Sequence, residues 1–138
     1  MVSETERHPG KSRPALLVSG NPDVVDLYVL ALRSARLGAL SVSSVDEAVQ
    51  LIRDRSISAV IVDVANPAVD WEVCRLLQSM VEDAVPLIVL TGWIDEEPRR
   101  AATALGCAAF VAKPASPERL LSVLDRTRKG ERGIVSMD

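Results

Sequence analysis

The sequence predicts a doubly wound α/β sandwich, in which a parallel sheet of five strands is covered by helices on both faces. Five short apolar runs alternate along the chain with segments whose apolar residues recur at helical spacing. The runs are apolar at every position rather than at alternate positions, which is typical of parallel strands buried on both faces. We therefore expect the strand order 2-1-3-4-5 with right-handed crossovers, and ligands beyond the carboxyl ends of the strands.

Composition excludes several classes of function. The 138 residues suit one domain with a single core. Lys and Arg number 16 against 19 Asp and Glu, so the net charge of −3 does not predict a nucleic-acid surface. Aromatic residues make up only 3%, too few for platforms that stack single-stranded bases. Two cysteines without CxxC spacing, Cys74 and Cys107, form neither a disulfide framework nor a zinc site.

Targeting signals and catalytic histidines are also missing from the sequence. The single histidine, His8, leaves no Ser-His-Asp triad and no histidine metal site within the chain. No apolar run approaches the ~18 residues that span a bilayer, and the polar N-terminus lacks the apolar centre of a signal peptide. We therefore expect a cytoplasmic protein with no membrane partner.

The first strand and helix follow a polar arm, residues 1–13, that we expect to be disordered. Residues 15–18 form the first apolar run. Asn21, Pro22 and Asp23 then supply an N-cap, a first-turn proline and a first-turn acid. The stripe of the helix that follows comprises Val24, Leu27, Tyr28, Ala31 and Ala35. We expect Gly38 to end this helix.

The second and third strands are expected at residues 39–43 and 59–62, and Asp63 ends the latter. Ser44 and Glu47 between them have the spacing of a capping box. The helix that begins there carries the stripe Val45, Ala48, Val49 and Ile52. The third helix follows Pro67 and carries the stripe Val73, Leu76, Leu77 and Met80.

The fourth strand, 86–90, ends at Thr91, and the fifth strand, 108–111, ends at Lys113. A helix from about residue 95 to 105 separates them. Ser116, Pro117 and Glu118 begin the last helix, whose stripe comprises Leu120, Val123 and Leu124. The stripe disappears from residue 129, so we expect a domain of residues 14–128 and a C-terminal tail or linker of residues 129–138.

Four strand ends carry polar residues or a turn that could form a site. The first strand ends at Ser19 and Gly20, the third at Asp63, the fourth at Thr91 and the fifth at Lys113. A carboxylate at such an edge can act as a nucleophile, and a hydroxyl with an ammonium can hold a phosphoryl group. Each residue taken singly fits a solvated loop, but three successive strand ends predict one shared site.

Three segments resemble the motifs of response-regulator receiver domains. They are Asp63 to Asp70, the pair Thr91-Gly92, and Gly106 to Pro114, and the resemblance extends over residues 14–128. It implies a flavodoxin-like fold in which Asp63 accepts a phosphoryl group from a histidine kinase. It also implies that Lys113 pairs with the phosphate and that Thr91 hydrogen-bonds to it.

The resemblance assigns further roles at the same edge. Phe110 matches an aromatic rotamer switch, although a plain core phenylalanine explains it equally well. The peptide bond between Lys113 and Pro114 is expected to be cis. Asp63 and the backbone carbonyl of Ala65 would be the metal ligands, and we expect Asp63 to be accessible to solvent.

Two residues depart from the receiver pattern where the metal would bind. Receivers carry an acidic pair at the end of the first strand, and Ser19 and Gly20 stand there instead. Mg²⁺ prefers carboxylate and water oxygens, so we expect weak Mg²⁺ binding, no other cofactor and impaired phosphorylation. Trp71 also stands where the family usually has glycine.

Three functional hypotheses remain open. The first is a phosphorelay receiver with an impaired Mg²⁺ site, and the second is a degenerate receiver that binds partners without phosphorylation. The third is a flavodoxin-like small-molecule binder. None of them is a turnover enzyme. The resemblance implies a histidine kinase or other signalling protein as partner, and a homodimer through the fourth helix, fifth strand and fifth helix, with Trp93 as a candidate anchor.

Overall fold

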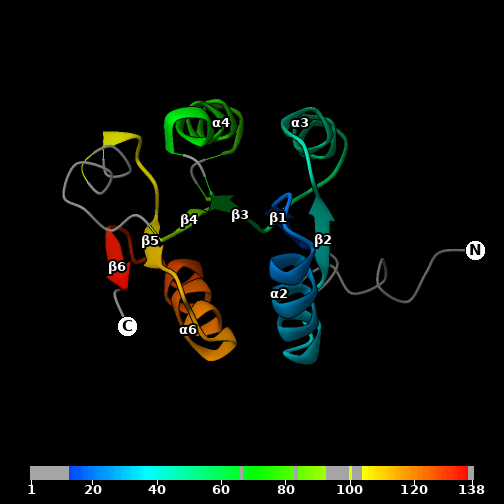
Figure 1. Cartoon of the computed structure of the whole chain (residues 1–138), viewed down its shortest axis with the longest axis vertical. Coiled ribbons are helices and arrows are strands. Elements are labelled where there is room, and N and C mark those ends of the chain that lie inside the picture. The colour runs from blue at the N-terminus through cyan, green and yellow to red at the C-terminus, as the bar shows by residue number, and fades with distance from the viewer. Residues whose placement is uncertain (1–12, 66, 83, 93–99, 101–103, 137–138) are drawn as a thin grey trace, which may run out of the picture.

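The computed structural model describes residues 13–65, 67–82, 84–92, 100 and 104–136, which form one six-stranded sheet between two layers of helices. Its helices and strands follow one another as shown in Figure 1. In chain order they are β1 (Ala15–Val18), α2 (Pro22–Ser34), β2 (Ala39–Val42), α3 (Val45–Asp54), β3 (Ala59–Val64), α4 (Pro67–Met80), β4 (Leu87–Thr91), β5 (Ala109–Ala112), α6 (Pro117–Arg128) and β6 (Ile134–Ser136).

The sheet confirms the expected direction and order of its first five strands. Every neighbouring pair is parallel, and the order is β2-β1-β3-β4-β5-β6. The strand order reverses at β1, which pairs with β2 on one side and β3 on the other. Their carboxyl ends therefore open a crevice at the topological switch point.

A sixth strand extends the sheet beyond the five that we predicted. Residues 129–138 were expected to form a tail, but Ile134 to Ser136 pair with β5, and the side chain of Ile134 is buried. Gly130 and Gly133 adopt φ values of 98° and 72° on the way, a region that favours glycine. Two apolar residues in sequence, Ile134 and Val135, are too short a run to predict a strand.

Two separate apolar layers form the core, one on each face of the sheet. Alternate strand residues contact α2 and α6 on one face and α3 and α4 on the other (Figure 1). The expected helical stripes supply most of these contacts. Leu27 and Leu76 are exceptions, because 46% and 44% of them are exposed; α2 packs through Tyr28 and Leu32 instead, and α4 through Cys74 and Leu77.

Three of the predicted helix starts are confirmed by their N-caps. Asn21 and Ser44 accept hydrogen bonds from the backbone N–H groups of Asp23 and Glu47. Ser116 accepts from the N–H of Arg119 in the same way. Each cap satisfies one of the backbone donors that the first turn of a helix leaves without a partner.

The end of α2 differs from the prediction. The helix ends at Ser34, four residues before Gly38, which we expected to stop it. Arg36 adopts a φ of 65°, and the N–H of Leu37 donates to the carbonyl of Leu32 at 2.9 Å. A non-glycine residue therefore occupies the left-handed position that usually ends a helix at glycine.

Some expectations concern residues outside the described ranges. The N-terminal arm of residues 1–12 and most of the predicted helix from about residue 95 to 105, with Trp93 before it, are among them. Within the described ranges, no helix is both long enough and apolar enough to cross a membrane.

Candidate functional site

Asp63 lies near the carboxyl end of β3, at the centre of the sheet. Strand alternation turns it toward the layer of α2 and α6, because Ala59 and Ile61 contact that layer. Only 2% of the Asp63 side chain is exposed, so the expectation of a solvent-accessible carboxylate is wrong. The reason is tertiary, since side chains from β1 and from the segment after β5 cover both carboxylate oxygens.

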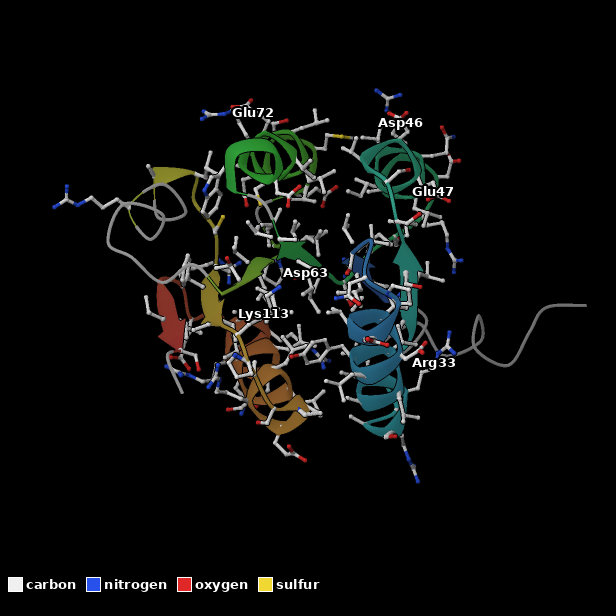
Figure 2. All side chains as sticks on the ribbon, in the orientation of Figure 1. Arg33, Asp46, Glu47, Asp63, Glu72 and Lys113 are labelled. Atoms are coloured by element: carbon white, nitrogen blue, oxygen red, sulfur yellow. The ribbon has the colours of Figure 1, made fainter. Side chains whose placement is uncertain are left out.

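Lys113 forms an ion pair with Asp63. Its Nζ atom lies 2.5 Å from Oδ1 of Asp63, and a quarter of the lysine side chain is exposed. Figure 2 shows the two side chains beside each other between the helix layers. The peptide bond between Lys113 and Pro114 is cis, as the resemblance implied. The backbone N–H of Lys113 donates to the carbonyl of Thr91 at 2.7 Å, which ties the segment to β4.

Ser19 contacts the other carboxylate oxygen. Its hydroxyl donates to Oδ2 of Asp63 at 2.8 Å, and Ser19 is buried. The backbone N–H of Asn21 donates to the same hydroxyl oxygen at 3.1 Å, which orients its proton toward Asp63. The sequence identified Ser19 only as a replacement for an acid, and this contact could not be read from its spacing.

The other predicted residues lie in different environments. Thr91 is fully buried at the end of β4, opposite Val64 in the ladder. Phe110 is buried in the layer of α3 and α4, on the face away from Asp63. The N–H of Ala65 donates to Oδ2 of Asp70 at 2.9 Å, so Asp70 holds the loop that follows β3.

A pocket of about 620 Å³ lies over these strand ends. It is bounded by the loops that follow β1, β2 and β3. Its polar lining residues are Ser19, Asn21, Ser43, Ser44, Asp63 and Asp70. Lys113, which contacts Oδ1 of Asp63, is not among the lining residues.

The residues present do not make the oxygen ligand set that Mg²⁺ prefers. The hydroxyl of Ser19 stands in place of a carboxylate, and Oδ1 of Asp63 already contacts an ammonium group. The Asp70 carboxylate is engaged by a backbone N–H. In the described part of the chain, no group of three or more His, Cys, Asp or Glu side chains is arranged to hold a metal ion. A hard divalent cation at Asp63 would share this carboxylate with Lys113 and Ser19, and it would need further oxygen ligands from backbone carbonyls or water.

Two further side chains near the site were missed by the sequence analysis in this role. Tyr28 of α2 was read as a core residue, and its hydroxyl donates to the carbonyl of Ala115 at 2.6 Å. Burial raises the pKa of Tyr28, the Arg119 charge opposes the rise and the Asp63 charge adds to it. Arg119 of α6 donates to the carbonyls of Ala112 and Pro114. No local motif marks either residue. Tyr28 bonds to a residue 87 positions away in the sequence, and Arg119 bonds back to the segment that joins β5 to α6.

The geometry supports charge pairing and hydrogen bonding at one carboxylate. A cation on one oxygen and a hydroxyl on the other stabilise the ionised carboxylate, through charge-assisted hydrogen bonds. A phosphoryl group at Asp63 would have to replace one of these contacts. The site therefore places a buried carboxylate, a group that can act as a nucleophile, in contact with a cation.

Comparison with known proteins identifies relatives among response regulators. Residues 15–125 match the family model of the response regulator receiver domain. The transcriptional regulatory protein GltR of Pseudomonas aeruginosa is 32% identical over 112 residues, which cover 80% of this chain and 46% of that protein. The chain thus spans about half the length of this curated relative.

Solved structures share the fold. A response regulator receiver protein from Pseudomonas putida is 25% identical with a TM-score of 0.72, over 83% of this chain and 97% of that one. A response regulator from Thermotoga maritima is 18% identical with a TM-score of 0.77, over 86% of this chain and 99% of that one.

Proposed function

The chain belongs to the response regulator receiver domain family. We propose that it is a receiver whose signalling state is set by protein partners rather than by Mg²⁺-dependent phosphorylation. Receiver domains are signalling modules of two-component systems, in which they interact with histidine kinases and output domains. One observation carries the proposal: both oxygens of Asp63 are held by side chains of the protein itself.

The electrostatics of the site support this proposal. In a receiver with an intact acidic pair, carboxylates repel one another until a divalent cation is bound. Here Ser19 replaces that repulsion with a hydrogen bond, and Lys113 supplies the positive charge. The buried pair is therefore compensated without metal, and the arrangement has little electrostatic need for Mg²⁺.

A second candidate function is a slow phosphoacceptor at Asp63. It is favoured by the position of Lys113, whose ammonium lies where it could stabilise a phosphoryl oxygen after a small displacement. Thr91 remains at the end of β4, and its hydroxyl-bearing side chain suits the hydrogen-bonding role that the family assigns. In this case phosphorylation at Asp63 would proceed with weak dependence on Mg²⁺.

A phosphotransfer assay separates the two candidates. The wild type and Asp63→Asn are incubated with a small phosphoryl donor and with a phosphorylated histidine kinase, in Mg²⁺ and in a chelator. The first proposal expects no label above that of Asp63→Asn in either condition. Label that requires Asp63 and changes little with Mg²⁺ supports the second candidate. Rapid labelling that requires Mg²⁺ contradicts both.

Ser19→Ala sharpens this assay. The variant frees Oδ2 of Asp63 but adds no acid, so it tests whether the hydroxyl restrains the carboxylate. We expect labelling to rise above the wild-type level if Asp63 is a restrained phosphoacceptor. An absorption spectrum of the purified protein checks the alternative of a flavodoxin-like binder, which predicts a bound chromophore.

We further propose that the partner is a histidine kinase or another signalling protein, and that a homodimer uses β5, α6 and the helix predicted from about residue 95 to 105, most of which lies outside the described residues. This proposal rests on the family membership and on Trp93, which lies outside the described residues. Light scattering and pull-down of wild type and Trp93→Ala test it. An unchanged mass and unchanged partner binding would argue against this surface.

A further inference from the structure

The segment that carries Lys113 lies just past the ladder of β5. Ala112 is the last residue of that strand, and it pairs with Thr91 of β4. Beyond this point the carbonyls of Pro114 and Ala115 have no strand partner among the described residues. Ala115 is buried, and a buried peptide group needs a hydrogen bond, so a side chain has to supply the partner of its carbonyl.

Two helices of the same layer supply those hydrogen bonds. The buried Tyr28 of α2 donates through its hydroxyl to the carbonyl of Ala115 at 2.6 Å. Arg119, in the first turn of α6, donates through Nη2 to the carbonyl of Ala112 and, at 3.4 Å, to that of Pro114. These hydrogen bonds fix the backbone before and after Lys113.

The guanidinium group of Arg119 is partly buried. Its Nε atom is buried and has no hydrogen-bond partner, which is unfavourable for a guanidinium group. The contacts of Nη2 with the Ala112 and Pro114 carbonyls therefore keep the guanidinium where it is. Ala112 and Pro114 are the two chain neighbours of Lys113, whose ammonium contacts Asp63.

We propose that Tyr28 and Arg119 are positioning residues that place the ammonium of Lys113 on Asp63. A lysine side chain is long and flexible, so fixing the backbone at its base reduces the number of positions its ammonium can reach and favours the contact with Asp63. The proposal deepens the proposed function, because it concerns the same metal-independent site. It also joins α2 and α6 to Asp63 through the segment from Ala112 to Ala115.

The test uses the full chain and two variants that remove only these donors. Tyr28→Phe deletes the hydroxyl, and Arg119→Met deletes the guanidinium. Thr127→Val is the matched control for the first, because the buried Thr127 hydroxyl donates to the carbonyl of Leu124 at 2.8 Å, away from the site. Arg126→Met is the control for the second, because Arg126 lies on the exposed surface of α6 and pairs with Glu131, which follows that helix.

Amide hydrogen exchange and the ammonium resonance of Lys113, both followed by NMR, report on its position. We expect exchange of the Lys113 amide to accelerate at least about tenfold in Tyr28→Phe and Arg119→Met, with less than about twofold change at the Val60 amide of β3. The Lys113 ammonium signal should broaden in the same variants. Arg119→Lys keeps a cationic donor and should restore part of the protection.

Equal acceleration at Lys113 and Val60 would overturn the proposal, because it would show a general loss of stability. An unchanged Lys113 amide, or the same change in the two control variants, would overturn it too. The readout does not involve phosphorylation. Rapid Mg²⁺-dependent labelling of Asp63 in the wild type would therefore contradict the proposed function while leaving this positioning role standing.

Discussion

The hydroxyl of Ser19 donates a 2.8 Å hydrogen bond to Oδ2 of Asp63, across 44 residues of sequence. Ser19 stands at the position where receiver domains carry one of two acids. An acid there would repel Asp63, whereas the hydroxyl stabilises its charge. At this position the protein therefore places a hydrogen-bond donor beside Asp63 in place of a second negative charge.

Restoring the acidic pair should restore metal binding. Ser19→Asp with Gly20→Asp adds two carboxylates beside Asp63, and we expect Mg²⁺ affinity to rise at least about tenfold over the wild type. The loop has room for a side chain at position 20, since a Cβ built at Gly20 meets no atom within 4 Å, whereas position 19 is buried beside Asp63. Calorimetric titration with Mg²⁺ measures the effect. The neutral pair Ser19→Asn with Gly20→Asn is the control, and equal affinity in both variants would show that charge is not the cause.

Removing Lys113 should destabilise the fold more than neutralising Asp63. Lys113→Met leaves the buried carboxylate without its cation, and we expect a loss of roughly 2–4 kcal/mol in the free energy of unfolding. Asp63→Asn leaves a lysine that is a quarter exposed and can turn to water, so its cost should be roughly 1 kcal/mol. Urea unfolding gives both values. A double variant less stable than the sum of the two single losses would contradict this view of the pair.

The sixth strand should contribute to stability through Ile134. We expect Ile134→Ala to cost roughly 2–3 kcal/mol, because the side chain is buried beside β5. Val135 is the matched control, since 44% of it is exposed and its truncation should cost less than about 0.5 kcal/mol. Thermal or urea unfolding compares the two. Equal effects would mean that β6 does not hold its place in solution.

The two buried thiols should make the fold less stable in alkali. Burial raises the pKa of Cys74 to about 12 and that of Cys107 to about 11, from 9.0 in an exposed thiol. Above about pH 9 the unfolded chain loses thiol protons that the folded chain retains, so the free energy of unfolding falls as pH rises toward 11. Burial raises the pKa of Tyr28 as well, which acts in the same direction. Urea unfolding from pH 8 upward measures the slope, and Cys107→Ala should reduce it; an unchanged slope would contradict the assignment.

Much of the fold could be predicted because local sequence signals agreed with tertiary packing. Continuous apolar runs marked five strands, and the caps at Asn21, Ser44 and Ser116 marked three helix starts. These signals depend on residues close in sequence. The predicted end of α2 at Gly38 is wrong because Arg36, and not a glycine, adopts the left-handed conformation that follows the helix. The strand β6 was missed because three residues gain their stability only from pairing with β5.

The sequence by itself determined which residues meet at the edge of the sheet. Asp63 and Lys113 each follow a parallel strand, and parallel strands bring their carboxyl ends together. Only the tertiary structure decided how they meet. The burial of Asp63, the contact from Ser19 and the hydrogen bonds of Tyr28 and Arg119 join elements far apart in the chain. Such contacts depend on side-chain directions and distances of a few ångströms, which spacing along a sequence does not encode.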